Sequence, residues 1–235
     1  MNNLLGGGLN TADYDDELIV ISKFSQPHRT NELQKCFEES KEKLNGKLNI
    51  YLLHWPFPFL WKKQWRAMEE LYLSGKCDAI GVCNFEKKHL KKLLRICRVK
   101  PFIDQLECHP LFQQNETTEY CKENDIRIMS YSPIARMNEK LIKNKTILDI
   151  ADKYNKNACQ IILRWDIEHG FIPIPASKSK AHMMDNLSVQ DFCLTKDEIA
   201  EIDRLECGMR IRYDPDKRFS KRQKLSFLKY RILGR

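Results

Sequence analysis

Short apolar runs alternate with amphipathic stretches at a regular spacing along most of the chain. The apolar runs predict six strands, over residues 18–22, 50–53, 79–83, 102–107, 126–130 and 171–174. Between and after them, apolar residues recur every three or four positions, which predicts helices over 31–44, 63–74, 86–98, 116–124, 145–154, 158–169, 180–186 and 195–205. This alternation is typical of repeated βα units around a parallel sheet, and not of a β-sandwich or a helical bundle.

Six βα repeats with no change in composition predict one closed or nearly closed barrel of the (β/α)8 type, which is an α/β fold. A complete barrel of this type needs eight units, so two are missing and we expect an incomplete barrel. We place the barrel domain at residues 1–216 and a basic C-terminal extension at residues 217–235.

The C-terminal extension accounts for the net charge of +8, because residues 217–235 hold eight basic side chains and no acidic one. The rest of the chain is balanced, so nucleic-acid binding by the main domain has little electrostatic support. Within the extension, Leu225, Leu228 and Ile232 recur at near-helical spacing. This leaves open a weak contact with an anionic membrane or a nucleic acid, but we favour a solvated extension, part of which packs over the pocket.

The composition also limits the class of protein. No apolar run approaches the roughly 18 residues of a membrane span. The N-terminus lacks a charged segment followed by an apolar one, so we expect a soluble, cytoplasmic protein. Nine cysteines without a Cys-x-x-Cys pair favour reduced thiols over a disulfide framework, and we expect no structural metal. The oligomeric state is left open.

Polar side chains recur near the C-terminal end of each predicted strand. The most informative is His54, which ends the buried run Ile50–Leu53 and precedes a Trp-Pro pair that is incompatible with a helix. Any one of these polar residues could simply mark the point where a strand passes into a loop. That explanation does not account for a polar residue at the end of every predicted strand. Because barrel enzymes keep their chemistry at this face, we expect an active site built from Lys23, His54, Cys83, Asn84, Gln105, Glu107, Tyr131, Ser132 and Ser177.

The chain resembles the aldo-keto reductases, which are (β/α)8 barrels that transfer a hydride between a nicotinamide dinucleotide and a carbonyl or alcohol. The resemblance runs from about Leu18 to Asp216 and depends on five motifs in a fixed order. They are Ile-Tyr-Leu-Leu-His-Trp-Pro at 50–56, Gly-Val-Cys-Asn-Phe at 81–85, Gln-Leu-Glu-Cys-His-Pro at 105–110, Ser-Tyr-Ser-Pro at 130–133 and Ile-Pro-Ala-Ser at 174–177. The resemblance implies an NAD(P)H-dependent reductase of a small aldehyde or ketone.

The resemblance also implies a role for each matched residue. His54 falls on the catalytic histidine, which orients the carbonyl and assists proton donation, and Lys23 falls on the lysine that lowers the pKa of the acid. Trp55 falls on a substrate-pocket tryptophan. Cofactor contacts are implied for the carboxamide at Cys83, Asn84 and Gln105, for nicotinamide stacking at Tyr131, for the phosphates at Ser132 and Ser177, for the 2′-phosphate at His182 and for adenine at Asn186.

The cofactor end departs from the family pattern. A lysine and an arginine that serve the 2′-phosphate of NADPH are replaced by Ala176 and His182, while Lys178 and Lys180 stand nearby. The choice between NADP(H) and NAD(H) therefore stays open. Cys83 stands where serine is usual in the carboxamide clamp and is a weaker hydrogen-bond partner.

The proton donor of the family is a tyrosine assisted by an aspartate, and both precede the strand that carries the lysine. Only 22 residues precede Lys23 here, and residues 2–10 resemble a degraded version of the helix that follows the tyrosine. Asp13 and Tyr14 lie in the loop that enters the first predicted strand, at the opposite end of the barrel, so we reject them as replacements. We expect the chain to begin just after its own general acid, with the first two βα units largely missing.

Two consequences are expected. Loss of a positioned general acid costs on the order of 10² to 10⁴ in rate, so we expect an impaired enzyme in which His54 donates a proton itself or through water. Two missing strands expose parallel edges, which invites aggregation or pairing with another chain.

Two other interpretations stay open. In the first, the chain is an inactive barrel that binds nicotinamide nucleotide as a sensor or regulatory partner, through Asn84, Gln105 and Tyr131. In the second, the true start codon lies upstream and the gene encodes an ordinary reductase.

Overall fold

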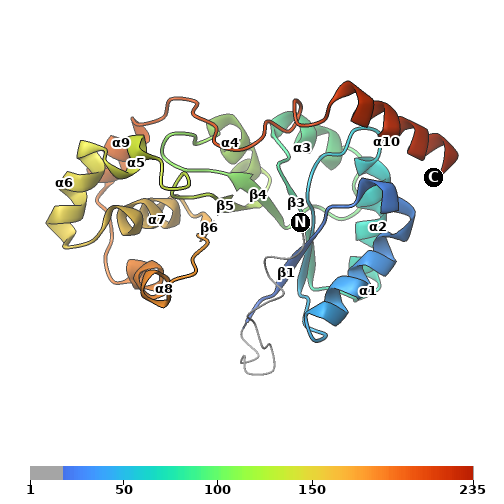
Figure 1. Cartoon of the computed structure of the whole chain (residues 1–235), viewed down its shortest axis with the longest axis horizontal. Helices are drawn as coiled ribbons and strands as arrows, with labels where there is room; N and C mark the ends of the chain where they lie inside the picture. Colours follow the sequence, from blue (N-terminus) through green and yellow to red (C-terminus); the bar gives the residue numbers. More distant parts are fainter. Residues whose placement is uncertain (1–17, 235) are drawn as a thin grey trace. The chain divides into compact units, whose positions relative to one another are not determined.

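The computed structural model describes residues 18–234. The segment 2–10 and the pair Asp13 and Tyr14 lie outside the described residues. The chain divides into two compact units (Figure 1). The first contains the chain up to Ile103 together with the stretch from Pro215 onward, and the second is Asp104–Asp214. We describe each unit by itself.

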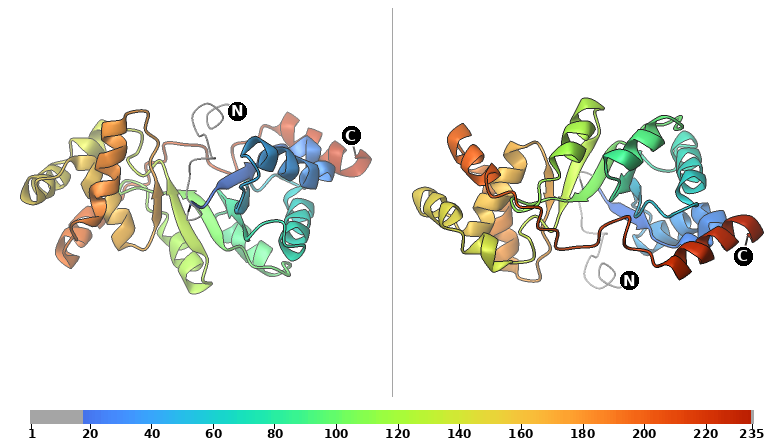
Figure 2. Two further views of the ribbon diagram at one scale, coloured as in Figure 1. Left: turned by 90° about the horizontal axis from the view of Figure 1, so that it is seen from below. Right: turned by 90° about the horizontal axis from the view of Figure 1, so that it is seen from above.

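The first unit alternates three strands with helices, as Figure 2 shows from two sides. Its strands β1 (Ile21–Phe24), β2 (Ile50–Leu53) and β3 (Ala79–Cys83) pair in parallel in that order. The helices that follow them are the 3-10 helix η2 (Pro27–Glu32), α1 (Leu33–Lys43), α2 (Trp61–Leu73) and α3 (Lys87–Leu94). One more helix, α10 (Lys221–Leu233), comes from the far end of the sequence and packs against η2.

The core of the first unit surrounds β2. All four residues of this strand are buried, as is typical of a parallel strand that is covered on both faces. The helix α1 packs on this core through one face, where Leu33, Cys36 and Phe37 are all buried. Gly75 follows the C-cap of α2 with a φ of +69°, the left-handed conformation in which glycine commonly ends a helix.

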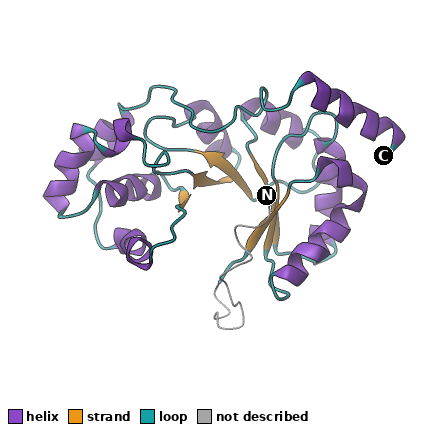
Figure 3. Ribbon diagram, in the orientation of Figure 1, coloured by secondary structure: helices purple, strands orange, loops and turns teal. Residues whose placement is uncertain are grey.

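The second unit carries the remaining strands and most of the helices (Figure 3). Its strands are β4 (Ile103–Glu107), β5 (Arg127–Tyr131) and β6 (Ile172–Ile174), and β5 pairs with β6 in parallel. Its helices are α4 (Asn115–Glu123), α5 (Glu139–Ile142), α6 (Lys145–Tyr154), α7 (Ala158–Glu168), α8 (Lys180–Leu187), the 3-10 helix η3 (Ser188–Gln190) and α9 (Lys196–Asp203). The strand order in the sheet follows the chain from β1 to β6.

The core of the second unit forms between its helices. Trp165 on α7 is 1% exposed and packs among Ile147, Ile161 and Ile202. The ring nitrogen of Trp165 donates to Asp203 Oδ1 at 2.8 Å, so the indole is satisfied as well as buried. A capping box begins α9: the side chains of Thr195 and Glu198 each accept a hydrogen bond from the other's backbone N–H.

The predicted class, α/β with six strands in chain order, is confirmed. The first strand lies later than predicted, at Ile21–Phe24, so Lys23 belongs to the strand instead of following it. The helix predicted over 86–98 ends at Leu94, because the backbone N–H groups of Arg98 and Val99 instead donate to the buried carboxylate of Glu69. Four elements were not predicted: η2, α5, η3 and α10.

No helix in the described part of the chain has the length and apolar character needed to cross a bilayer. All nine cysteines are free thiols.

Gly81 lies in the middle of β3, where a neighbouring backbone approaches closely. A Cβ atom at this position would lie 2.5 Å from the carbonyl oxygen of Ile103 and 2.7 Å from the side chain of Leu52. We expect Gly81→Ala to lower the free energy of unfolding by about 1–3 kcal/mol, because the backbone must shift to admit the methyl group. Urea denaturation measures this change, and an unaltered midpoint would contradict the close approach.

Candidate active site

The first unit brings Lys23, His54 and Asn84 to the carboxyl ends of three adjacent strands. Lys23 is the third residue of β1 and stands in register with Leu52 on β2. His54 directly follows β2, and Asn84 directly follows β3. The parallel register of the strands therefore places these side chains at one end of the sheet.

The backbone of His54 is held on both sides. Its N–H donates to the carbonyl oxygen of Phe24 at 3.1 Å, and its carbonyl oxygen accepts from Nδ2 of Asn84 at 3.1 Å. Asn84 is 5% exposed and has a φ of +61°, a left-handed conformation that asparagine adopts more readily than most residues. The amide of Asn84 thus fixes the position from which the imidazole extends.

The imidazole of His54 has a hydroxyl partner that sequence reasoning missed. Ser25 Oγ lies 2.5 Å from Nδ1 of His54. Burial first, and then the positive charges of Lys23 and Arg218, lower the pKa of His54 from its ordinary value of 6.5 to about 3. The ring is therefore neutral near pH 7. With the Ser25 hydroxyl donating to Nδ1, the ring proton lies on Nε2, which can then donate a hydrogen bond.

Trp55 stacks on this imidazole and also contacts the C-terminal segment. The rings of His54 and Trp55 are 5.6 Å apart at 29°. The guanidinium of Arg218 lies 4.5 Å over the Trp55 ring, and Phe219 meets that ring edge-on at 6.4 Å. Arg218 and Phe219 were not among the predicted site residues. The aromatic residues within the basic extension were the sequence signal that could have indicated a packing contact with the site.

The second unit holds Gln105, Tyr131 and Ser132 on β4, on β5 and directly after β5. Gln105 is 4% exposed, and its Nε2 donates to the thioether sulfur of Met129 at 2.9 Å. A thioether is a weak acceptor, so this buried amide is suited to a stronger polar partner. Tyr131 ends β5 and is half-buried, and Ser132 follows with a φ of +52°.

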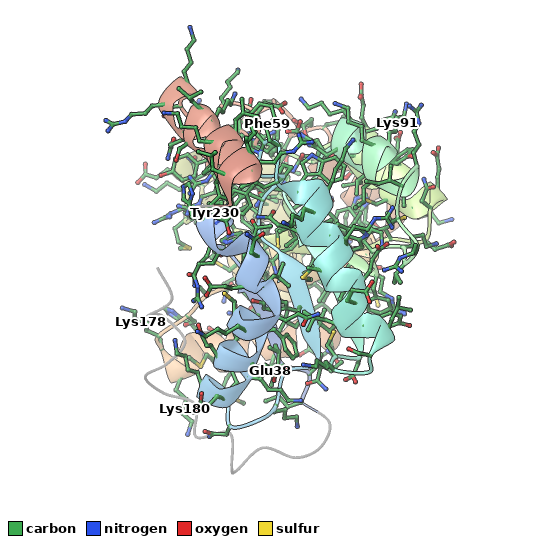
Figure 4. The ribbon with its side chains drawn as sticks, turned by 90° about the vertical axis from the view of Figure 1, so that its right-hand side faces the viewer. Glu38, Phe59, Lys91, Lys178, Lys180 and Tyr230 are labelled. Atoms are coloured by element: carbon green, nitrogen blue, oxygen red, sulfur yellow. The ribbon has the colours of Figure 1, made fainter. Side chains whose placement is uncertain are left out.

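Ser177, His182 and Asn186 lie along α8 and the loop before it. Ser177 Oγ accepts from the backbone N–H of Ser179 at 3.1 Å, and Ser179 caps α8 by accepting from the N–H of His182. His182 is exposed in the first turn and Asn186 is half-buried near the last residue of the helix. Two further exposed cations, Lys178 and Lys180, extend near the start of α8 (Figure 4). A helix N-terminus with cations around it suits a phosphate.

Two residues of the expected set are deeply buried. The carboxylate of Glu107 is 1% exposed and accepts from the backbone N–H groups of Ile211 and Arg212 at 2.5 and 2.9 Å. It therefore ties the segment after α9 to β4. Cys83 ends β3 and is also 1% exposed.

Comparison with known proteins gives the class. The model of the aldo/keto reductase family matches residues 2–206. A 9,11-endoperoxide prostaglandin H2 reductase of Trypanosoma cruzi is 42% identical over 186 residues, which cover 78% of this chain and 66% of that protein. A glyoxal reductase of Bacillus subtilis is 38% identical over 203 residues, which cover 86% of this chain and 73% of that protein. The chain thus spans between 66 and 73% of the length of these relatives.

Solved structures agree with the sequence matches. The aldo-keto reductase MGS-M4 from a deep-sea metagenome superposes with a TM-score of 0.82 at 30% identity, over 86% of this chain and 76% of that one. A Bombyx mori aldo-keto reductase in complex with NADP gives a TM-score of 0.79 at 28% identity, over 85% and 71%. The fold is that of the α/β barrel oxidoreductases. Within that class, the chain belongs to the aldo/keto reductase family.

His54 is expected to stay neutral well into the acid range. Its pKa in the folded chain, about 3, lies below the ordinary value of 6.5, so the unfolded chain binds the proton more readily. The free energy of unfolding should therefore fall as the pH drops from 6.5 toward 3. The ¹⁵N shifts of the ring report its protonation directly. A His54→Gln variant should show a shallower pH dependence of stability, and a ring that titrates near pH 6.5 would contradict the burial argument.

Ser25 is expected to set the tautomer of His54. Ser25→Ala removes the hydroxyl next to Nδ1, so the ring should lose its preference for a proton on Nε2, which the ¹⁵N shifts of both ring nitrogens measure. Ser25→Thr keeps a hydroxyl and serves as the matched control. If the alanine variant shows the same tautomer ratio as the threonine variant, the hydroxyl does not orient the ring.

Proposed function

We propose that this chain binds NADP(H) and catalyses the reduction of a small aldehyde or ketone to an alcohol, with slow turnover. The observation that carries this proposal is the neutral imidazole of His54, held by Ser25 and Asn84 beside a cationic strand residue, Lys23. A hydrogen-bond donor with positive charge nearby is what a carbonyl oxygen needs as negative charge develops on it.

The assigned residues suit a nicotinamide dinucleotide. Asn84 and Gln105 offer amides for the carboxamide. The Gln105 amide donates to the thioether sulfur of Met129, a weak acceptor that a carboxamide oxygen could replace. Tyr131 offers a ring for stacking and Cys83 lies beside Asn84. We assign the remaining contacts with phosphates and adenine to Ser132, Ser177, His182 and Asn186. When bound, the cofactor supplies the hydride that reaches the carbonyl carbon.

The cations near α8 favour the 2′-phosphorylated form of the cofactor. Lys178, Lys180 and the exposed ring of His182 lie at the start of this helix, where the helix dipole adds a partial positive charge. The Bombyx mori relative was solved in complex with NADP. We therefore infer a preference for NADPH over NADH.

The chemistry assigned to this chain's own residues has two parts. His54 Nε2–H donates to the carbonyl oxygen of the substrate, and the charges of Lys23 and Arg218 stabilise the oxygen as it becomes an alkoxide. The proton that completes the alcohol is the slow part. A neutral imidazole is a weak acid near pH 7 and gives up its ring proton slowly. We infer that water delivers the proton, with His54 orienting the oxygen.

The proposal is tested with the 235-residue chain, by NADPH fluorescence for binding and by oxidation of NADPH with methylglyoxal or glyoxal for turnover. We expect His54→Gln to lower turnover about 10²-fold, because one donor to the developing oxyanion is lost, while the Kd for NADPH stays the same. Gln105→Leu should raise that Kd about tenfold, because a buried hydrogen bond to the carboxamide is lost.

His169→Gln, at the C-cap of α7, removes a histidine outside the assigned set and should change neither quantity. A turnover rate in His54→Gln equal to that of the unaltered chain would exclude the assigned role of the imidazole. Binding of NADPH without any oxidation that depends on a carbonyl compound would instead favour the inactive barrel that acts as a nucleotide sensor or regulatory partner. Absence of NADPH binding would contradict both the reductase and the nucleotide sensor.

A further inference from the structure

Helix α10 has an inner face that anchors it to the first unit. Phe227 and Tyr230 are 4% and 6% exposed, and both rings pack against the ring of His28, at 5.4 and 5.5 Å. The hydroxyl of Tyr230 accepts from the backbone N–H of Asn31 at 3.2 Å. Figure 4 shows Tyr230 between α10 and the first part of the chain. The inner face is therefore used for packing.

The opposite face of α10 is apolar as well. At 100° per residue, Leu225, Leu228 and Ile232 fall within one narrow stripe, on the side of the helix away from Phe227 and Tyr230. Lys221 lies at the N-terminal end of the same stripe. Leu225 is 53% exposed and Ile232 is 71% exposed, while Leu228 between them is half-buried. Packing within the unit therefore does not account for the apolar character of this stripe.

Basic side chains border the stripe on both sides. The helical positions place Arg222 and Lys229 along one edge and Lys224 and Arg231 along the other. No acidic residue occurs between Lys217 and the C-terminal end. Figure 4 shows side chains with nitrogen atoms at their ends extending outward from α10. We call this surface the basic ridge: Leu225, Leu228 and Ile232 with Arg222, Lys224, Lys229 and Arg231.

We propose that the basic ridge binds the surface of an anionic phospholipid membrane. An amphipathic helix that lies in the plane of a bilayer inserts its apolar stripe at the level of the headgroups, while cations beside the stripe pair with anionic lipids. The inner face of α10 keeps its contacts with His28 and Asn31 in this arrangement. A nucleic acid would use the cations alone and leave Leu225 and Ile232 in water, so the stripe favours lipid.

This surface lies outside residues 2–206, the part of the chain that the family model matches. The inference concerns where the protein resides and is independent of the reaction proposed for His54. A membrane contact of this kind recruits the protein reversibly, since one amphipathic helix with a few cations binds far more weakly than a membrane span.

The test is co-flotation of the full chain with vesicles of equal parts phosphatidylserine and phosphatidylcholine, and with vesicles of phosphatidylcholine alone. We expect binding to the anionic vesicles that weakens steeply as salt is added. Lys229→Gln or Arg222→Gln should each reduce the affinity about fivefold. The pair Leu225→Gln and Ile232→Gln keeps every charge and should reduce it about tenfold.

The matched control is the pair Leu187→Gln and Lys143→Gln, which removes one exposed apolar side chain and one charge elsewhere on the surface and should bind like the unaltered chain. Far-ultraviolet circular dichroism confirms that each variant folds. Equal binding to both kinds of vesicle, or full affinity in the Leu225→Gln and Ile232→Gln pair, would overturn the proposal. So would absence of vesicle binding in a chain that binds a short duplex DNA, because the cations alone then explain the surface.

Discussion

The pairing of β2 with its two neighbours is the constraint on which the first unit depends. β2 is buried along its whole length, and its register with β1 and β3 decides which side chains stand together at the carboxyl ends. The backbone bond from His54 N–H to Phe24 continues this pairing one residue past the strand. A shift of one residue would turn the imidazole to the other face of the sheet, so the chemistry assigned to His54 depends on backbone geometry before it depends on any side chain.

The electrostatics around His54 follow from the same geometry. Burial removes water from the ring, and the positive charges of Lys23 and Arg218 add to the cost of protonating it. The result is a histidine that donates a hydrogen bond as a neutral group and does not act as an acid near pH 7. Ser25 and Asn84 have complementary roles here, since one contacts the ring and the other contacts the backbone.

Sequence pattern predicted most of the regular elements, because buried parallel strands and amphipathic helices leave periodic traces. The bounds of β2, β3 and α6 were predicted to the residue. The start of β1 was not, because Leu18 and Ile19 are apolar yet exposed. The spacing within the extension singled out Leu225, Leu228 and Ile232, whereas Phe227 and Tyr230 are the residues that pack. Periodicity shows that a helix has an apolar face but not which face the protein covers.

In the candidate site too, the sequence indicated individual residues but not their contacts. The motifs drew attention to His54, and the structure then supplied its contacts. Ser25 carries no signal of its own, because serine is common after strands and its contact with His54 arises only when β1 and β2 pair. Arg218 was not singled out by the motifs either, since it lies 163 positions beyond Trp55 in the sequence numbering and reaches that ring through the fold.

The two units differ in how their residues are distributed along the chain. The second is one uninterrupted stretch, Asp104–Asp214, whereas the first needs the stretch that begins at Pro215 in addition to the residues up to Ile103. During synthesis the continuous stretch has all of its residues available first. The unit that carries His54 is incomplete, with Trp55 and Phe57 lacking the aromatic contacts of Phe219, until the stretch that begins at Pro215 has been synthesised as well.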